Sequence, residues 1–69
     1  MSATFHWLDV TRIGEELAEH HPEVDPLTIS FPRLKALVEA LPGFAERPGH
    51  PPNERILEAI QQAWIDERE

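Results

Sequence analysis

The first segment with helical periodicity lies near the start of the chain. Its apolar residues share one helical face: Val10, Ile13, Leu17 and Ala18. This spacing predicts a helix that follows an N-cap at Asp9 or Thr11. The helix should end near His21, because Pro22 follows and cannot continue it.

Gly14 lies inside this predicted helix. A glycine there costs about 1 kcal/mol relative to alanine, which suggests that another backbone or a bulky ring packs closely against it. We expect that group to be the ring of Trp7.

A second helix follows a proline-rich turn at 22–26 and a short stretch at 27–31 that we expect to be extended. Pro32 suits the first turn of this helix, because its fixed backbone angle already matches the helical one. The apolar residues of the helix recur at positions i, i+3, i+4 and i+7: Leu34, Leu37, Val38 and Leu41. This stripe predicts a face that packs into the core.

A third helix is predicted to begin at or just before Asn53, after a loop rich in proline and glycine at 42–52. It carries a wide apolar stripe: Ile56, Leu57, Ile60, Ala63 and Trp64. Phe44 in the loop should pack back onto the core. The pattern therefore predicts a mainly all-α fold of three helices in a single domain, 1–69, of which 1–6 form a flexible N-terminus.

Composition narrows the possible functions. A chain of 69 residues has room for one small core. Thirteen acidic and six basic side chains give a net charge of -7, which repels nucleic acid and attracts basic protein surfaces and divalent cations. The chain contains no cysteine, so it cannot form a disulfide, carry a persulfide or ligate a metal through thiolates.

Sequence features of enzymes and of membrane proteins are missing. The chain has no nucleophile elbow and no glycine-rich phosphate loop, and so small a helical domain has little room for a catalytic cleft. No apolar stretch approaches the length of a membrane span, and the first residues do not resemble a signal peptide. We therefore expect a cytoplasmic protein that is not an enzyme and does not bind membranes.

Candidate metal ligands gather in the first helix and the turn after it. Glu15 and Glu19 are four residues apart, as are Glu16 and His20, so each pair can present ligands from one helical face. Oxygen donors with occasional imidazole suit ferrous iron, manganese or magnesium. The alternative is a solvated acidic face that only keeps the domain in solution, and the spacing by itself favours this alternative.

Several short blocks occur together and in order over residues 7–69. In the first half they are Trp7-Leu8-Asp9, Ile13-Gly14-Glu15 with Leu17, and Pro22-Glu23-Val24-Asp25-Pro26 with Thr28 and Phe31. In the second half they are Asn53-Glu54, Ile56-Leu57-Glu58-Ala59-Ile60, Trp64 and Asp66-Glu67. In these blocks the chain resembles the IscX family, also called YfhJ, which are small accessory proteins of bacterial iron–sulfur cluster assembly.

This resemblance implies a compact helical fold of modified winged-helix type that does not bind nucleic acid. It implies a monomer that docks on the cysteine desulfurase of the assembly system, competes there with the frataxin-like protein and modulates cluster formation. It also implies weak binding of iron, as Fe²⁺, through surface carboxylates. The carboxylates that we assign to iron are Glu15, Glu19, Glu23 and Asp25. Those that we assign to the partner are Glu16, Glu54, Glu58, Asp66 and Glu67.

Two departures from the family pattern affect these assignments. The loop at 45–50 has mixed charge, whereas the family pattern has an acid-rich loop there. We therefore assign the iron site to the first helix and the turn after it rather than to this loop. Gln61 and Gln62 stand where the family can carry apolar residues, which suggests a more exposed face there.

Two alternative functions remain open from the sequence. The first is a winged-helix-like module that binds DNA, although the second and third helices carry few basic residues: Arg33 and Lys35, and Arg55 and Arg68. The second is an iron-binding protein that acts without the desulfurase.

Overall fold

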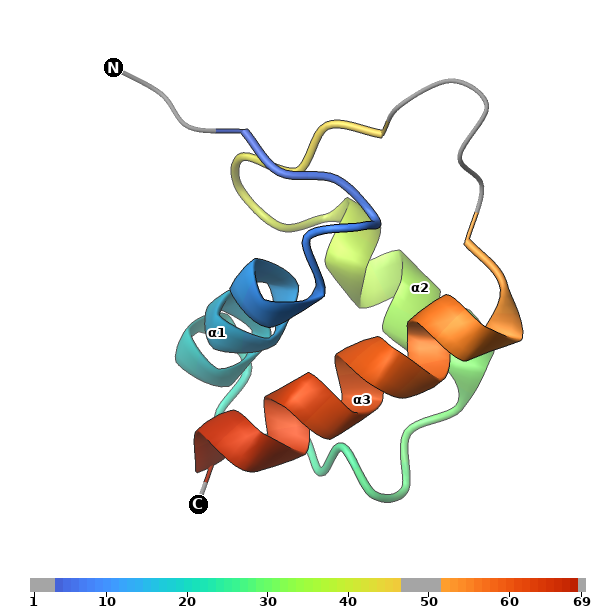
Figure 1. The fold of residues 1–69 in the computed structure, drawn as a ribbon. Coiled ribbons are helices and arrows are strands. Elements are labelled where there is room, and N and C mark those ends of the chain that lie inside the picture. Colours follow the sequence, from blue (N-terminus) through green and yellow to red (C-terminus); the bar gives the residue numbers. More distant parts are fainter. Residues whose placement is uncertain (1–3, 47–51, 69) are drawn as a thin grey trace.

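The computed structural model describes residues 4–46 and 52–68. Within them the chain forms three helices, α1 (Val10–His20), α2 (Phe31–Glu39) and α3 (Glu54–Arg68), as Figure 1 shows. These ranges contain an isolated β-bridge but no regular strand, so the predicted mainly all-α fold is confirmed. The likeness to a winged helix stays a prediction. None of the described helices is long and apolar enough to cross a membrane.

The core lies between the three helices and the segment that precedes α1. Its side chains are at most 8% exposed: Phe5, Trp7, Ile13, Leu17, Leu34, Val38, Leu41, Leu57, Ile60 and Trp64. Each predicted helical stripe contributes to this core, and α1 packs chiefly against α3. Because the apolar residues recur at helical spacing, each helix buries one face and leaves the opposite face to its charged residues.

Gly14 marks the point where α1 meets α3. A Cβ atom at this position would lie 2.8 Å from the backbone carbonyl carbon and from the Cβ of Ala63, and 3.0 Å from the backbone nitrogen of Trp64. The close neighbour is therefore the backbone of α3, and the expectation that it is the ring of Trp7 was wrong. Glycine is needed here because a side chain would force the two helices apart.

The side chain predicted to cap the first helix does not do so, whereas side chains do cap the other two helices. Asp9 precedes α1, but its side chain makes no cap hydrogen bond to the helix. Instead, Oδ2 of Asp9 accepts a hydrogen bond of 3.0 Å from the backbone N–H of His6. The side chains of Ser30 and Asn53 do cap α2 and α3, accepting from backbone N–H groups three residues later.

The N-terminal segment pairs with the loop that follows α2. Phe5 and Phe44 form a parallel β-bridge, in which the N–H of Phe5 donates to Gly43 and the N–H of Ala45 donates to Phe5. The ring of Phe44 also meets the rings of Phe5 and Trp7 edge-on, at centroid distances of 5.9 and 4.9 Å. The expected return of Phe44 to the core is therefore confirmed.

The packed core begins closer to the N-terminus than the sequence predicted. Residues 1–6 were predicted to be flexible, but Phe5 is 2% exposed and belongs to the core. Trp7 is further fixed because its indole N–H donates to Oε1 of Glu46, at 3.0 Å. Residues 1–3 lie outside the described residues. Burial of Phe5 against the loop after α2 is a long-range contact, which the local sequence pattern does not show.

Only part of the stretch at 27–31 is extended as predicted: residues 26–28 form a turn, whereas Ser30 has extended backbone angles. The backbone N–H of Leu27 donates to Oδ1 of Asp25 at 2.9 Å, and the N–H of Thr28 donates to the Asp25 carbonyl oxygen at 3.3 Å. These bonds fold the chain back locally, as an aspartate at the start of a turn commonly does. Phe31 already belongs to α2.

Candidate functional site

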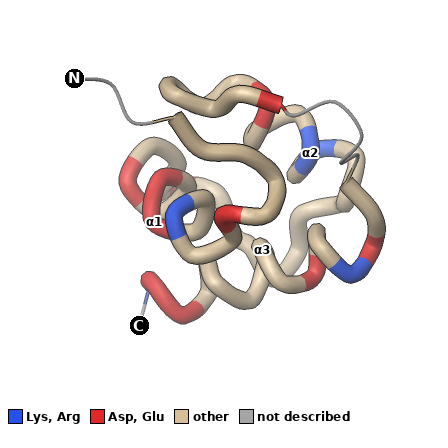
Figure 2. The backbone as a smooth tube through the Cα atoms, turned by 45° about the horizontal axis from the view of Figure 1, so that its top comes forward, with Lys and Arg blue, Asp and Glu red and all other residues tan. Residues whose placement is uncertain are grey.

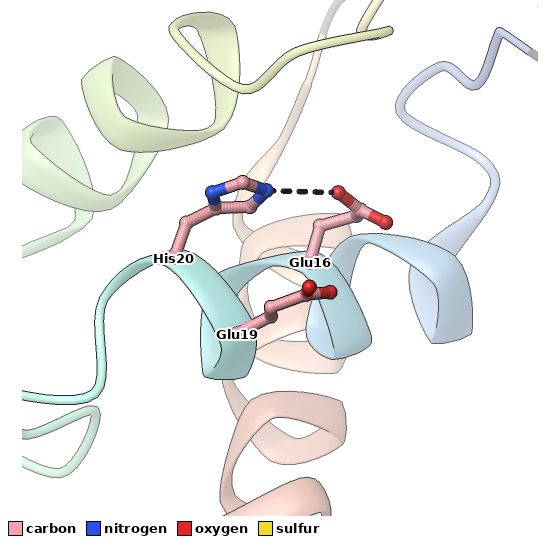
Figure 3. A group of neighbouring side chains, drawn as sticks. All are labelled: Glu16, Glu19 and His20. Carbon is pink, nitrogen blue, oxygen red and sulfur yellow. Dashed lines mark ion pairs between the residues drawn. The ribbon is translucent and has the colours of Figure 1, made fainter.

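One cluster of possible metal ligands is present in the described ranges, and it lies on α1. One ligand atom from each of Glu16, Glu19 and His20 falls within 4.8 Å of those of the other two. Figure 3 shows the three side chains projecting from the helix, with the ion pair between His20 and Glu16 marked. The spacing i, i+3, i+4 produces this arrangement, because such residues are neighbours on a helical surface.

Glu16 is the most engaged member of this cluster. Its Oε2 accepts a hydrogen bond of 3.1 Å from Nε of Arg12, and its Oε1 lies 3.3 Å from Nε2 of His20. The Arg12 guanidinium also lies 5.2 Å from the centroid of the Phe5 ring. A cation that approached Glu16 would therefore compete with the guanidinium of Arg12.

The four carboxylates assigned to iron do not form one group in the structure. Glu19 belongs to the α1 cluster, while Glu15 is exposed on the same helix without belonging to it. Glu23 and Asp25 lie in the turn after α1, where Glu23 pairs with Nδ1 of His21 at 3.8 Å. Glu16 and His20 replace Glu15 in the cluster. Their i, i+4 spacing is the sequence signal that identifies them.

The carboxylates assigned to a partner lie mainly on α3. Glu54 and Glu58 are exposed in its first half, and Asp66 and Glu67 are exposed at its end. At a rise of about 1.5 Å per residue, Glu54 and Glu67 lie roughly 20 Å apart along the axis, so they form two separate acidic groups. In Figures 1 and 2, α1 and the C-terminal end of α3 lie on the same side of the molecule.

The turn after α1 is fastened to α3 by two side chains. Nε2 of Gln61 donates to the carbonyl oxygen of Pro26 at 2.6 Å, and Nη1 of Arg68 donates to that of Val24 at 2.8 Å. Gln61 is thus half-buried and holds the turn, although the sequence suggested an exposed face there. Gln62 is exposed, as expected, and donates to Asp66.

The charged side chains of the described residues lie at or near the surface. No polar or charged residue in the described ranges is buried. The surface carboxylates can attract cations and basic groups, which is the chemistry of a binding protein.

Comparison with known proteins identifies the family. A family model described as "Iron-sulphur cluster assembly" matches residues 5–69. An uncharacterized protein of Pseudomonas aeruginosa is 46% identical over 63 residues, which cover 91% of this chain and 94% of that protein. The match begins at Phe5, where the folded core also begins. The chain therefore belongs to the IscX (YfhJ) family of iron–sulfur cluster assembly proteins.

Proposed function

We propose that this protein is a non-enzymatic accessory factor that binds the cysteine desulfurase through its acidic surface and modulates cluster formation. It acts as a monomer in the cytoplasm. The supporting observation is the exposed carboxylate surface on α1 and α3 of a chain with a net charge of -7, in a family of iron–sulfur cluster assembly proteins. Because the chain has no cysteine, it cannot carry sulfur or hold a cluster through thiolates and must act through another protein.

Docking depends on charge complementarity. The desulfurase would present a basic surface to Glu16 and to the carboxylates of α3, which are Glu54, Glu58, Asp66 and Glu67. Such complementarity raises the association rate and selects the partner. A frataxin-like protein that uses the same basic surface would be displaced, so the two proteins would compete for the desulfurase. Modulation of sulfur delivery then follows from occupation of the desulfurase.

Iron binding is the second part of the proposal. Glu16, Glu19 and His20 offer two carboxylates and one imidazole, a donor set that suits Fe²⁺. Glu15, Glu23 and Asp25 add negative charge from the same helix and the following turn. The affinity for iron should be low, because Glu19 and His20 are exposed and the guanidinium of Arg12 already donates a hydrogen bond to Glu16. A weakly held ion allows cluster assembly to respond to the iron supply.

A charge-reversal experiment tests the docking surface. The variant Glu54→Lys/Glu58→Lys and the variant Asp66→Lys/Glu67→Lys should each bind the desulfurase at least about tenfold more weakly in calorimetry. Glu39→Lys is the control, because Glu39 is exposed at the end of α2 and belongs to neither assigned set of carboxylates. Unchanged affinity in both multiple variants would contradict the proposed docking.

An NMR titration tests the iron site. Under anaerobic conditions, Fe²⁺ should broaden the amide signals of Glu16, Glu19 and His20 first. The variant Glu16→Gln/Glu19→Gln should lose this broadening, whereas Glu39→Gln should keep it. Broadening confined to α2 or to the start of α3 would overturn the assignment to α1. Iron binding without any binding to the desulfurase would favour the alternative of an iron protein that acts alone.

The DNA-binding alternative finds no support in the arrangement of charge. Of the basic residues on α2 and α3, Arg68 donates to the turn after α1, and Arg55 is flanked in sequence by Glu54. Helices that enter a groove of DNA need a basic stripe to neutralise phosphates. A mobility-shift assay at low salt should therefore show no complex with duplex DNA.

A further inference from the structure

Leu27 is the most exposed of the large apolar side chains in the described ranges. Its relative exposure is 70%, whereas the core side chains are at most 8% exposed. A single exposed leucine needs no explanation by itself. Its surroundings, however, include further apolar side chains and a rim of carboxylates.

The turn that carries Leu27 is held in place by its neighbours. Asp25 accepts the backbone N–H of Leu27, and α3 donates to the carbonyl oxygens on both sides of Asp25, those of Val24 and Pro26. Pro26 itself is buried. Leu27 is therefore presented to solvent by a fixed backbone. A preorganised side chain loses less conformational freedom when it binds a partner, which favours affinity.

Leu27 lines a shallow hollow on the surface between this turn and the end of α3. Pro26 and Ile65 share its lining, and Glu23, Asp25 and Arg68 form its charged part. The hollow has a volume of about 310 Å³, near the lower limit of about 300 Å³ for small-molecule pockets. Because it is also open to solvent, it suits one side chain of a protein better than an enclosed ligand.

The apolar surface extends along α3 beyond this hollow. Ile65 also lines a neighbouring hollow, together with Phe31 and Glu58. The apolar side chains of the two hollows form what we call the Leu27–Ile65 strip: Pro26, Leu27, Phe31, Ala59 and Ile65. Its charged border holds three carboxylates, Glu23, Asp25 and Glu58, and two guanidinium groups, Arg55 and Arg68. Arg68, the cation beside Leu27, already donates to Val24. An apolar centre with a charged rim is the usual anatomy of a protein interface.

We propose that the Leu27–Ile65 strip is an apolar anchor for the partner, which inserts an aliphatic or aromatic side chain flanked by lysine or arginine. This inference rests on the proposed docking to the desulfurase and adds a contact that charge alone does not provide. The charge around the strip favours a basic partner over a second copy of this chain. A second copy of this chain would bring Glu23, Asp25 and a net charge of -7 against their equivalents, whereas a basic partner neutralises them.

Calorimetric titration of the desulfurase with Leu27→Ser tests the anchor. The variant should raise the Kd by about tenfold, and by a similar factor at two salt concentrations, because screening acts on charges and spares apolar contacts. Leu8→Ser is the matched control. Leu8 is 53% exposed just before α1 and lines neither hollow, so this variant should leave the Kd within about twofold.

The outcomes separate the anchor from the docking itself. If the unmodified protein binds and Leu27→Ser binds equally well, the anchor is overturned while the docking stands. If the unmodified protein does not bind the desulfurase, both proposals fail. Sedimentation of the unmodified protein alone should show a monomer. A dimer that Leu27→Ser abolishes would assign the strip to a second copy and overturn the basic partner.

Discussion

The α1 face and the turn at 22–28 both carry carboxylates, but they hold them in different ways. On α1, Glu16 pairs with Arg12 and His20 of the same helix. In the turn, Asp25 lies beside the exposed Leu27, and two side chains of α3 fix the backbone. The first arrangement places several ligand atoms close together, which suits a small cation. The second combines charge with apolar surface, which suits a protein.

The two regions are also fastened to the core by different means. Helix α1 meets α3 through the close backbone approach at Gly14, whereas the turn is held by hydrogen bonds from Gln61 and Arg68. Substitutions at these positions can therefore loosen one region without the other. Acidity alone does not separate an ion site from a docking site, and the neighbours of each carboxylate are needed to tell them apart.

The largest effect on stability is expected at Gly14, where α1 packs against α3. Gly14→Ala should destabilise the fold by about 1–3 kcal/mol, because the added Cβ lies 2.8 Å from Ala63 and overpacks the contact. The midpoint of thermal unfolding, measured by circular dichroism, should fall by about 4–8 °C for each kcal/mol. The control Glu15→Ala, on an exposed neighbour, should change stability by less than about 0.5 kcal/mol. A stabilised Gly14→Ala variant would refute the close approach.

A smaller effect is expected at the attachment of the turn. Gln61→Ala removes the donor to Pro26 and should cost about 1 kcal/mol. Hydrogen exchange at the amides of Leu27 and Thr28 should accelerate, because the turn opens more readily. Gln62→Ala is the control, since Gln62 is exposed and bonds only to Asp66 on its own helix. Equal exchange rates in both variants would show that Gln61 does not fix the turn.

The smallest effect concerns the charge balance of the α1 cluster. Arg12→Gln should strengthen Fe²⁺ binding by about two- to fivefold. In bulk water a guanidinium at about 4 Å repels a divalent ion by roughly 2 kcal/mol, and salt screening together with movement of the exposed Arg12 side chain reduces this to about 0.4–1 kcal/mol. Lys35→Gln on α2 makes the same change in net charge at an exposed residue that does not line the hollows beside the turn. It should leave the Kd for Fe²⁺ unchanged. Weaker binding to Arg12→Gln would indicate that Arg12 positions Glu16 for the ion.

Local features were predicted from the sequence more reliably than long-range contacts. Periodicity and backbone chemistry predict the helical stripes, the start of the third helix near Asn53 and the place of Pro32 in the second helix, and the structure confirms them. Burial of Phe5 and the contact of Gly14 with Ala63 were missed, because each depends on a segment distant in sequence. The turn at 26–28 was missed because the side chain of Asp25 competes with extended structure.

The same distinction between local spacing and long-range contacts applies to the candidate sites. The pairing of Glu16 with His20 is visible as a spacing of four residues, and the structure adds Glu19 to it. The strip around Leu27 and Ile65 joins residues from a turn and from the last helix, so no periodicity could reveal it. Gln61 offered no signal either, since its role depends on the position of the Pro26 carbonyl.

The central claim is that an acidic surface docks this protein on the desulfurase. The most direct test is the Kd of the unmodified protein for the desulfurase, measured by calorimetry in about 0.1 M and about 1 M salt, where the Debye length falls from about 10 Å to about 3 Å. We predict that the Kd rises by at least about tenfold at the higher salt concentration. A Kd that is the same at both concentrations would contradict docking through the carboxylates.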